Sequence, residues 1–506
     1  MIYRITNNTA PAVALDDIPV VSYAAFYDDL AARLRDERYH VAHYFALPDE
    51  AETHLRFFCL LLDDAAAEVL LTSFVMDYYA ECPLPSLTAL HPQLHPFERE
   101  IAERWGVRFE GMPWPKPLRF PCDRADRTST IDNYPFYKME GRALHEVNVG
   151  PIHAGIIEPG AFRFICNGEN VLHLEIALGY QHRGTERLMT ATDNRLQQVL
   201  LAESAAGDSS VAHATAFAEA VEKLTDGAAA AAALAPERAV AIELERMAMQ
   251  IADTGALCMD TGYQLGQVAC EALRTMTINT TQAWGGNRFG KGLIRPAGTD
   301  HPLTAEKAAM IRGNAAEIAR RYAEVCHDLR TSPSLLARFE QCGIVPRTEM
   351  VRIGGVGQAA RASGVARDIR TTHPWGLYAG QPGRETITEE EGDVMARLSV
   401  RCRETAQAAA LIDRLLDGFA PAAPVRPDYD APLRPASLAF GLVEGWRGET
   451  CHVAVTDSAG RIAAYRIKDP SLHNWMALAL AVRGEGISDF PICNKSFNLS
   501  YCGHDL

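Results

Sequence analysis

The chain has 506 residues, of which 48% are hydrophobic and 22% charged, and its formal net charge is −15. This composition is ordinary for a globular protein, and the length suffices for two or three domains with sizeable cores. The negative charge argues against nucleic acid or an anionic membrane surface as a direct partner. No apolar run approaches the roughly 20 residues that span a bilayer, and the N-terminus lacks the basic-then-apolar layout of a signal peptide.

The twelve cysteines are scattered along the sequence. The closest pair is Cys493 and Cys502, and the motif C-x-x-C does not occur. Because iron–sulfur clusters and structural zinc need clustered thiolates, we expect no such site on this chain. The cysteines are predicted to be mostly buried, reduced thiols of a cytoplasmic protein.

Residues 1–120 are predicted to form a unit of their own. Residues 28–38 are expected to form a helix, and the runs HYFAL, HLRFFCLLL and EVLLTSFVM are expected to be buried strands. Residues 97–100, Phe-Glu-Arg-Glu, fall on a further helix. We interpret the charged residues of that helix as a solvated face whose expected role is docking. Residues 121–145 are polar and turn-rich, and they are interpreted as a connector.

The chain is organised around residues 150–210. Gly and Pro punctuate the start, and alternating apolar residues then predict a hairpin. A strand is expected to give way to a helix near His182, and a second helix is expected to break at Gly207. Polar groups at such breaks usually line a cleft, because chain ends leave backbone groups free; a solvated loop is the alternative. The polar residues gathered here are His182, Arg183, Glu186, Glu203, Asp208 and Ser209.

Residues 236–257 show the clearest helical periodicity. One apolar stripe consists of Leu244, Met247, Ala248 and Ile251. The adjacent stripe is polar and consists of Glu243, Arg246, Gln250 and Asp253. Such a polar stripe suits a helix that lines a cleft, and it equally suits a surface helix.

Three later segments complete the pattern. The run GGVGQAARASGV is glycine-rich, but the strand-GxGxxG-helix order of a nucleotide site is absent, so that signal is weak. Residues 389–417 predict a long amphipathic helix. Residues 451–467 alternate around the turn Asp-Ser-Ala-Gly and predict a β-hairpin that delivers Asp469 back to the cleft.

Several motifs, in this order, resemble the large subunit of the membrane-bound, energy-converting nickel–iron hydrogenases and its relative, the quinone-site subunit of complex I. They cover most of the chain and lie at residues 150–153, 182–186, 203–209, 243–246, 288–290, 294–296 and 469–470. Residues 97–100, followed by Trp105-Gly106-Val107, resemble the accessory subunit that packs against the quinone-site subunit. In this family, residues 345–375 correspond to a hairpin on the substrate side, and the helix at 236–257 lines the cleft.

The sequence departs from the family at its metal ligands. Such hydrogenases hold nickel and iron with four thiolates, and the matching positions here are Ala206, Ser209, Ser471 and Asn474. Because a soft-metal site needs sulfur and alanine has no donor atom, we expect no metal site here and no hydrogenase chemistry. The positions that meet the quinone headgroup in complex I are Ile157 and Ala206. Neither side chain can donate a hydrogen bond, so a complex I-type quinone site is not implied either.

The resemblance implies an α+β protein in three parts. These are an accessory-subunit-like α/β domain at 1–120, a connector at 121–145, and a mainly helical hydrogenase-like core with small β-hairpins at 146–506. Arg288 approaches the cleft from the opposite side and is a candidate counter-ion for Glu203 or Asp208, with a structural ion pair as the alternative. The cleft candidates are His153, His182, Arg183, Glu186, Glu203, Asp208, Asp253, Arg288 and Asp469.

The implied function is that of a hydrogenase-like subunit in a membrane-associated, complex I-related oxidoreductase. Such a subunit couples electron transfer or proton handling to a membrane arm on the cytoplasmic side. The expected partners are an iron–sulfur small subunit, which carries the clusters, and antiporter-like membrane subunits. Two alternatives stay open: an active oxidoreductase for quinone or another substrate in a rebuilt pocket, and a structural adaptor without catalysis. Whether the chain is itself an enzyme is left open.

Overall fold

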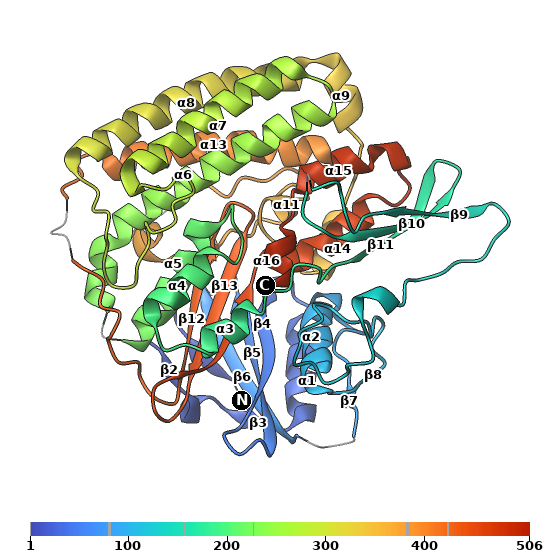
Figure 1. Ribbon diagram of the computed structural model, residues 1–506, viewed down its shortest axis with the longest axis vertical. Coiled ribbons are helices and arrows are strands. Elements are labelled where there is room, and N and C mark those ends of the chain that lie inside the picture. Colours follow the sequence, from blue (N-terminus) through green and yellow to red (C-terminus); the bar gives the residue numbers. More distant parts are fainter. Residues whose placement is uncertain (1, 79–81, 156, 226, 381–384, 422–424) are drawn as a thin grey trace.

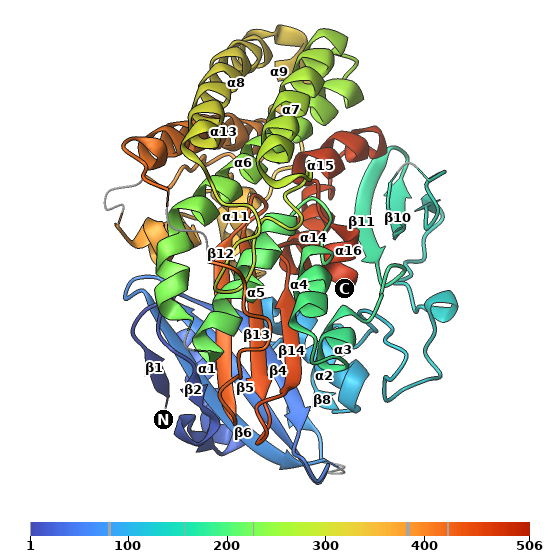
Figure 2. The same cartoon turned by 60° about the vertical axis from the view of Figure 1, so that its left-hand side comes forward.

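The computed structural model describes residues 2–78, 82–155, 157–225, 227–380, 385–421 and 425–506. The long helices form a layer at one end of the molecule, and two sheets lie side by side beneath it (Figures 1 and 2). A small antiparallel arm projects from one side (Figure 1). The structure is of the predicted α+β class.

The N-terminal sheet is built on the three predicted strands. Its order is β1-β6-β5-β4, with β3 parallel to β6, and its strands are Tyr3–Ile5 (β1), Val20–Val21 (β3), Tyr39–Pro48 (β4), His54–Asp63 (β5) and Glu68–Asp77 (β6). Successive side chains of a strand point to opposite faces. On β5, Phe57 and Leu61 therefore pack with the helices α1 (Tyr23–Arg33) and α2 (His95–Trp105), whereas Phe58 and Leu60 join the main core. Burial of both faces explains why this run is almost continuously apolar.

Two expectations for the N-terminal part are wrong. The first helix begins at Tyr23 rather than near residue 28, because the Ser22 side chain caps it by accepting from the Ala25 N–H at 3.3 Å. Glu98 is not solvated: its carboxylate is fully buried and accepts hydrogen bonds from Ser86 Oγ, Thr88 Oγ1 and the Leu87 N–H. Glu98 therefore anchors the loop that leads into α2.

The second sheet joins distant parts of the chain. Its order is β14-β13-β12-β2, and its strands are Val13–Ala14 (β2), Ser437–Glu444 (β12), Glu449–Thr456 (β13) and Ile462–Lys468 (β14). β13 and β14 form the predicted hairpin, whereas β12 was not predicted. Helix α5 (Ser210–Leu224) packs on β12 and β13. The division of the chain at residue 120 stays a prediction.

The projecting arm contains the predicted hairpin that follows residue 160. Its strands, in the order β11-β10-β9, are Leu144–Val149 (β9), Ala161–Asn167 (β10) and Asn170–Ala177 (β11). The connector at 121–145 leads into β9 and contains little regular structure beyond a short 3-10 turn at Ile131–Asn133. A further short pair joins Leu84–Pro85 (β7) to Phe109–Glu110 (β8).

The helical layer consists of α6 (Ala228–Asp260), α7 (Gln264–Gly285), α8 (Ala305–Thr331) and α13 (Val394–Leu416). α6 contains the helix predicted at 236–257, and its apolar stripe is buried as expected. α13 matches the helix predicted at 389–417 but begins five residues later, after the cap at Asp393. The shorter helices are Thr185–Thr190 (α3), Arg195–Glu203 (α4), Pro333–Phe339 (α9), Arg347–Arg352 (α10), Gly357–Arg361 (α11), Ile369–Thr372 (α12), Ser471–Ala481 (α14), Phe490–Phe497 (α15) and Tyr501–Asp505 (α16).

The hairpin expected at 345–375 is wrong, because α10, α11 and α12 occupy this segment. Its glycines are needed for close packing instead: a Cβ at Gly357 would lie 1.8 Å from the Arg447 carbonyl oxygen. The cysteines are free and mostly buried, with Cys82 and Cys122 exposed. Within the described ranges, no helix has both the length and the hydropathy of a membrane span.

Candidate functional site

Four segments that are far apart in sequence meet beside the N-terminus of α5. They are the break between α4 and α5, the turn between β12 and β13, the residues that follow β14, and the tail after α15. Arg447, in the β12–β13 turn, connects them. Its guanidinium donates to both carboxylate oxygens of Asp208 at 2.6 Å and to the Asn498 carbonyl oxygen at 2.7 Å. We call Arg447, Asp208, Asn498, Asp253 and Arg401 the Arg447 cluster.

The rest of the Arg447 cluster continues into the helical layer. The Asn498 side-chain amide donates to Asp253 on α6 at 2.5 Å, and Arg401 on α13 lies 3.0 Å from the same carboxylate. Asp253 and Arg401 are buried, whereas the Asp208 side chain is 35% exposed. The cluster therefore reaches from the surface into the core as one hydrogen-bonded path.

Burial and charge act against each other in this cluster. Burial lowers the pKa of Arg447, but the carboxylates of Asp208, Asp469 and Asp253 reverse this and raise it above its usual value. Burial raises the pKa of Asp253 to about 6, although Arg401 and Arg447 oppose the shift. Burial also raises the pKa of Glu245 to about 8, although its carboxylate accepts from the Val211 and Ala212 N–H groups. Two carboxyl groups near this junction thus titrate near neutral pH.

Asp469 lies at the same junction and is fully buried. It accepts a hydrogen bond from His213 Nε2 at 3.1 Å and from the Ser471 N–H at 2.8 Å. Although burial raises its pKa, these two hydrogen bonds and Arg447 lower it below its usual range. Asp469 is therefore held as a carboxylate.

The four positions that match the family's thiolate ligands do not fit a nickel–iron centre. Ala206 offers no donor, and the Ser471 hydroxyl accepts from the Ser500 N–H at 2.9 Å. The Asn474 amide bonds both backbone groups of Val356, at 3.1 and 3.0 Å. Ser209 lies beside Arg447 at 3.4 Å. Nickel and iron centres of this kind need soft thiolates, and these oxygens are hard donors that hold the fold instead.

Glu203 forms a second, separate ion pair. The buried carboxylate accepts from Arg295 Nη1 and from the Gly292 N–H, each at 2.7 Å. The prediction that Arg288 is the counter-ion of Glu203 or Asp208 is therefore wrong. Arg288 is exposed, and its guanidinium lies 4.8 Å from the centre of the Phe289 ring. The glycine-punctuated break positions Arg295 inward and Arg288 outward.

Glu186 belongs to a third group at the start of α3. It lies 2.9 Å from Arg466 and 3.4 Å from Arg104, and it accepts from the Ile467 N–H at 2.9 Å. Burial opposes its ionisation, but Arg466, Arg119 and Arg104 prevail and lower its pKa. Glu186 thus joins α3, the second sheet and α2.

The remaining candidates hold backbone groups and lie apart from the Arg447 cluster. His153 Nε2 lies 2.9 Å from the Gly160 carbonyl oxygen, and His182 Nδ1 lies 2.8 Å from that of Asp505. Arg183 donates to the carbonyl oxygens of Ser204, Ala205 and Cys502 and so ties the α4–α5 break to the tail. Of the predicted cleft residues, the structure brings together Asp208, Asp253 and Asp469.

The polar stripe of α6 does not face solvent, so its interpretation as a surface helix is wrong. Glu243 is fully buried between Arg246 and Arg370, each at 3.0 Å, and also accepts from the Tyr378 hydroxyl at 2.8 Å. The Gln250 amide donates to Glu404 on α13 at 2.6 Å. The stripe therefore packs against α12 and α13 through ion pairs and against the β12–β13 turn through hydrogen bonds from Arg246.

Sequence reasoning missed Arg447 and the histidines His213 and His452. The signal for Arg447 was its place in Glu-Gly-Trp-Arg-Gly, a glycine-punctuated turn before an alternating strand. The histidines gave no such signal, because a lone histidine in an apolar segment is ordinarily a core residue. Within the described residues, no three His, Cys, Asp or Glu side chains lie close enough to share a metal ion.

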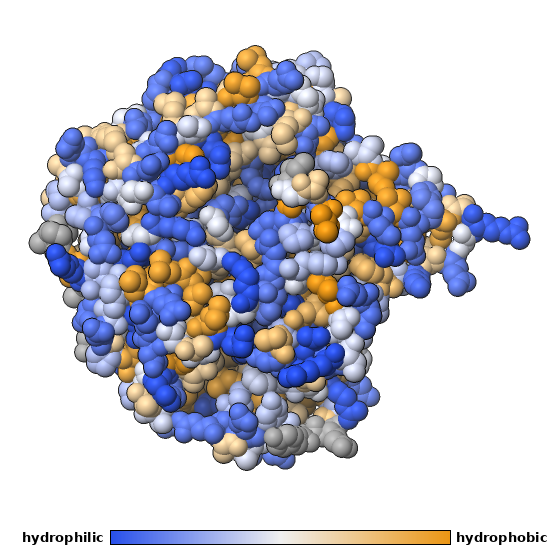
Figure 3. All heavy atoms as spheres, in the orientation of Figure 1, coloured by the Kyte–Doolittle hydropathy of each residue, from blue (hydrophilic) through white to orange (hydrophobic). Residues whose placement is uncertain are grey.

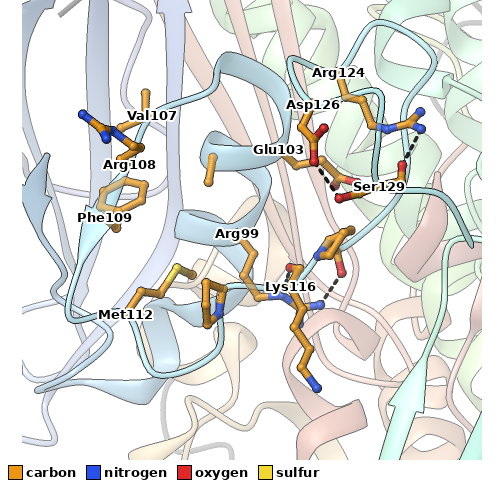
Figure 4. A pocket seen from close by; sticks show the side chains of 13 residues that line it. Arg99, Glu103, Val107, Arg108, Phe109, Met112, Lys116, Arg124, Asp126 and Ser129 are labelled. Atoms are coloured by element: carbon orange, nitrogen blue, oxygen red, sulfur yellow. Dashed lines mark hydrogen bonds between the residues drawn. The ribbon is translucent and has the colours of Figure 1, made fainter. Parts of the chain in front are cut away.

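A cavity of about 400 Å³ lies elsewhere, between α2, β8 and residues 112–129 (Figure 4). Its polar side chains already hold the surrounding loops. Arg99 donates to the Lys116 carbonyl oxygen at 2.8 Å, and Arg124 donates to that of Ser129 at 2.6 Å. The cavity contains none of the predicted cleft residues, so we do not assign the site to it.

Comparisons with known proteins agree with this architecture. Residues 21–136 match the family model of the 30 kDa subunit of respiratory-chain NADH dehydrogenase, and residues 260–432 match that of the 49 kDa subunit. Formate hydrogenlyase subunit 5 of Escherichia coli is 28% identical over 440 residues, which are 82% of this chain and 76% of that protein. The chain is a fused relative of these complex I subunits and of the hydrogenase large subunits.

Further relatives include both hydrogenases and NADH-quinone oxidoreductase subunits. The carbon monoxide-induced hydrogenase of Rhodospirillum rubrum is 28% identical over 361 residues, covering 70% of this chain and 98% of the relative. NADH-quinone oxidoreductase subunit 4 of Thermus thermophilus is 27% identical over 379 residues, which are 68% of this chain and 89% of that relative. The relatives are thus subunits of hydrogenase and NADH-quinone oxidoreductase complexes. Their likeness confirms the predicted family.

Proposed function

We propose that the chain is the hydrogenase-like subunit of a membrane-associated, complex I-related oxidoreductase and that it holds no nickel–iron centre. The observation that carries this proposal is the Arg447 cluster. A guanidinium supplies the positive charge at the junction of the two segments whose thiolates bind the metals in the family. The carboxylates around it remain ionisable, and Asp253 has a pKa of about 6. This supports proton handling at the junction in place of hydrogen chemistry.

In this proposal the chain couples electron transfer or proton handling to a membrane arm on the cytoplasmic side. The partners are an iron–sulfur small subunit, which carries the clusters, and antiporter-like membrane subunits. A hydrophobic surface over α3 and α4 supports such docking (Figure 3). We call it the α3–α4 patch; its members Leu188, Leu196 and Leu200 are 39%, 39% and 47% exposed. Contiguous exposed apolar surface of this kind usually marks a protein interface.

The first test concerns metal. The purified chain, produced with nickel in the medium, is expected to contain far less than one nickel per chain, because no thiolate occupies the four positions. Elemental analysis measures this. As a control, the combined variant Ala206→Cys, Ser209→Cys, Ser471→Cys and Asn474→Cys is expected to retain a thiophilic divalent ion. Stoichiometric nickel in the parent chain, or hydrogen uptake by its complex, would contradict the proposal.

The second test concerns assembly. The chain expressed alone is expected to aggregate, and co-expression of the iron–sulfur subunit is expected to keep it in solution. The substitution Leu200→Glu places a charge in the α3–α4 patch and should abolish co-purification. Leu265→Glu is the matched control, because Leu265 is 71% exposed at the start of α7, outside the patch. A monodisperse chain that is indifferent to the partner would disprove assembly of this kind.

A further inference from the structure

Four buried side chains form a continuous hydrogen-bonded line that ends at Asp469. The Tyr465 hydroxyl on β14 lies 2.8 Å from His452 Nδ1 on β13. His452 Nε2 lies 2.9 Å from His213 Nδ1 on α5, and His213 Nε2 lies 3.1 Å from Asp469 Oδ2. All four side chains are fully buried. The line therefore runs through the core of the second sheet and reaches the junction from its dry side.

The chemistry of the end groups decides which atoms carry the protons. The Asp469 carboxylate can only accept, so His213 donates to it from Nε2. A neutral imidazole carries one N–H, so His213 Nδ1 accepts and His452 donates from Nε2. His452 Nδ1 then accepts from the Tyr465 hydroxyl. Burial, with His213 beside it, lowers the pKa of His452, in keeping with a neutral ring. Every donor thus points towards Asp469.

We propose that Tyr465, His452 and His213 form a proton relay that serves Asp469; this rests on the proposed proton handling at the junction. When Asp469 takes the Nε2 proton of His213, His213 Nδ1 takes the Nε2 proton of His452, and His452 Nδ1 takes the hydroxyl proton of Tyr465. One proton moves at each step and no electron is transferred, so Asp469 is briefly protonated while Tyr465 is briefly a phenolate. The three protons then return along the line and Asp469 is again a carboxylate; the proton it held exchanges with solvent at the junction, where the Asp208 side chain is 35% exposed. His213 and His452 each give up the Nε2 proton and receive another at Nδ1, so both rings remain neutral.

A purely structural role does not require this arrangement. Burying three polar side chains in a sheet core costs free energy unless each is hydrogen-bonded, and apolar residues would fill the same volume at lower cost. The line also links two ends with different surroundings. Tyr465 adjoins Arg466, which holds Glu186, and Asp469 adjoins the Arg447 cluster. A relay explains why the polar groups are consecutive.

The test compares Tyr465→Phe with Tyr322→Phe. Each substitution removes one buried hydroxyl, because Tyr322 is also buried and its hydroxyl bonds Thr254 Oγ1 at 2.6 Å, outside the line. The readout is the exchange of the His213 Nε2 proton with D₂O, followed by NMR on the full chain, with its partner, labelled with ¹⁵N-histidine. The relay predicts at least tenfold slower exchange in Tyr465→Phe and unchanged exchange in Tyr322→Phe. Unfolding temperatures confirm that both variants are folded.

Equal exchange rates in the two variants would overturn the relay. So would a His213 ring that carries its proton on Nδ1 in the parent chain, since the donors would then point away from Asp469. Neither result bears on assembly. Conversely, a chain that does not co-purify with an iron–sulfur subunit contradicts the proposed function and leaves the exchange result standing. The two failures are therefore distinguishable.

Discussion

Arg361→Met is expected to lower the free energy of unfolding by about 3–5 kcal/mol, the usual cost of removing one partner from a buried ion pair. Arg361 is fully buried between Glu404 and Glu444, each at 2.7 Å. Both carboxylates are 1% exposed, so neither can recover its lost partner from water. Methionine fills similar volume, so the loss is one of charge and hydrogen bonds. Urea unfolding of the two proteins measures the difference.

Arg320→Met is the matched control for this prediction. Arg320 also pairs with two carboxylates, Glu317 at 3.0 Å and Glu324 at 2.9 Å, but its side chain is 61% exposed. Water replaces the lost partner there, so the expected cost is only about 0–1 kcal/mol. Similar costs for both substitutions would show that Arg361 does not stabilise the core. A large difference would establish that α11, α13 and β12 are held together by charge.

The local patterns in the sequence predicted much of the fold. Apolar runs and alternation gave β4, β5, β6 and the β13–β14 hairpin, because a strand's burial is encoded in its own residues. On α6, apolar residues that recur every three or four positions predicted the buried stripe for the same reason. β12 was missed although both of its faces are buried along the whole strand, because its apolar run is short and is interrupted by Gly441, which weakens the strand signal.

The partners of charged residues could not be predicted in the same way. Arg288 and Arg295 lie in the same glycine-punctuated break, and only the three-dimensional path of the chain decides that Arg295 meets Glu203. Glu98 looked solvated on its helix, and a loop twelve residues earlier in the chain buries it. The sequence predicted which segments come together at the site, because Asp208, Asp253 and Asp469 lie at the same junction. Arg447, which joins them, comes from a turn that carried no charge pattern.

Acidification is expected to act through the histidines between the two sheets. His43 on β4 is fully buried, and neither ring nitrogen has a hydrogen-bond partner among the described residues. Burial lowers its pKa to about 3; Glu186 opposes this shift, whereas Arg466 and Lys468 add to it. In the unfolded chain a histidine titrates near about 6.5. Between these two values the unfolded state binds the extra proton, so acid favours unfolding.

His43→Leu removes this acid sensitivity and keeps an apolar side chain against Phe45 and Phe97. Near pH 7 the substitution should change stability by less than about 1.5 kcal/mol. Between pH 7 and pH 5 the free energy of unfolding of the variant should rise relative to that of the parent by about 2 kcal/mol. This corresponds to about 1.4 kcal/mol for each pH unit below about 6.5. Carboxyl groups such as Asp253 titrate in both proteins, so their contribution cancels in the difference.

The control is His54→Leu, because His54 is 48% exposed and lies beside Asp49 and Asp77. A protonated ring is solvated and paired there, so its removal should bring no stability at pH 5. Urea unfolding at both pH values gives the four free energies. A pH-independent difference for His43→Leu would mean that water reaches His43 between β4 and β14. The expected result instead requires a dry contact between the N-terminal sheet and the second sheet around His43.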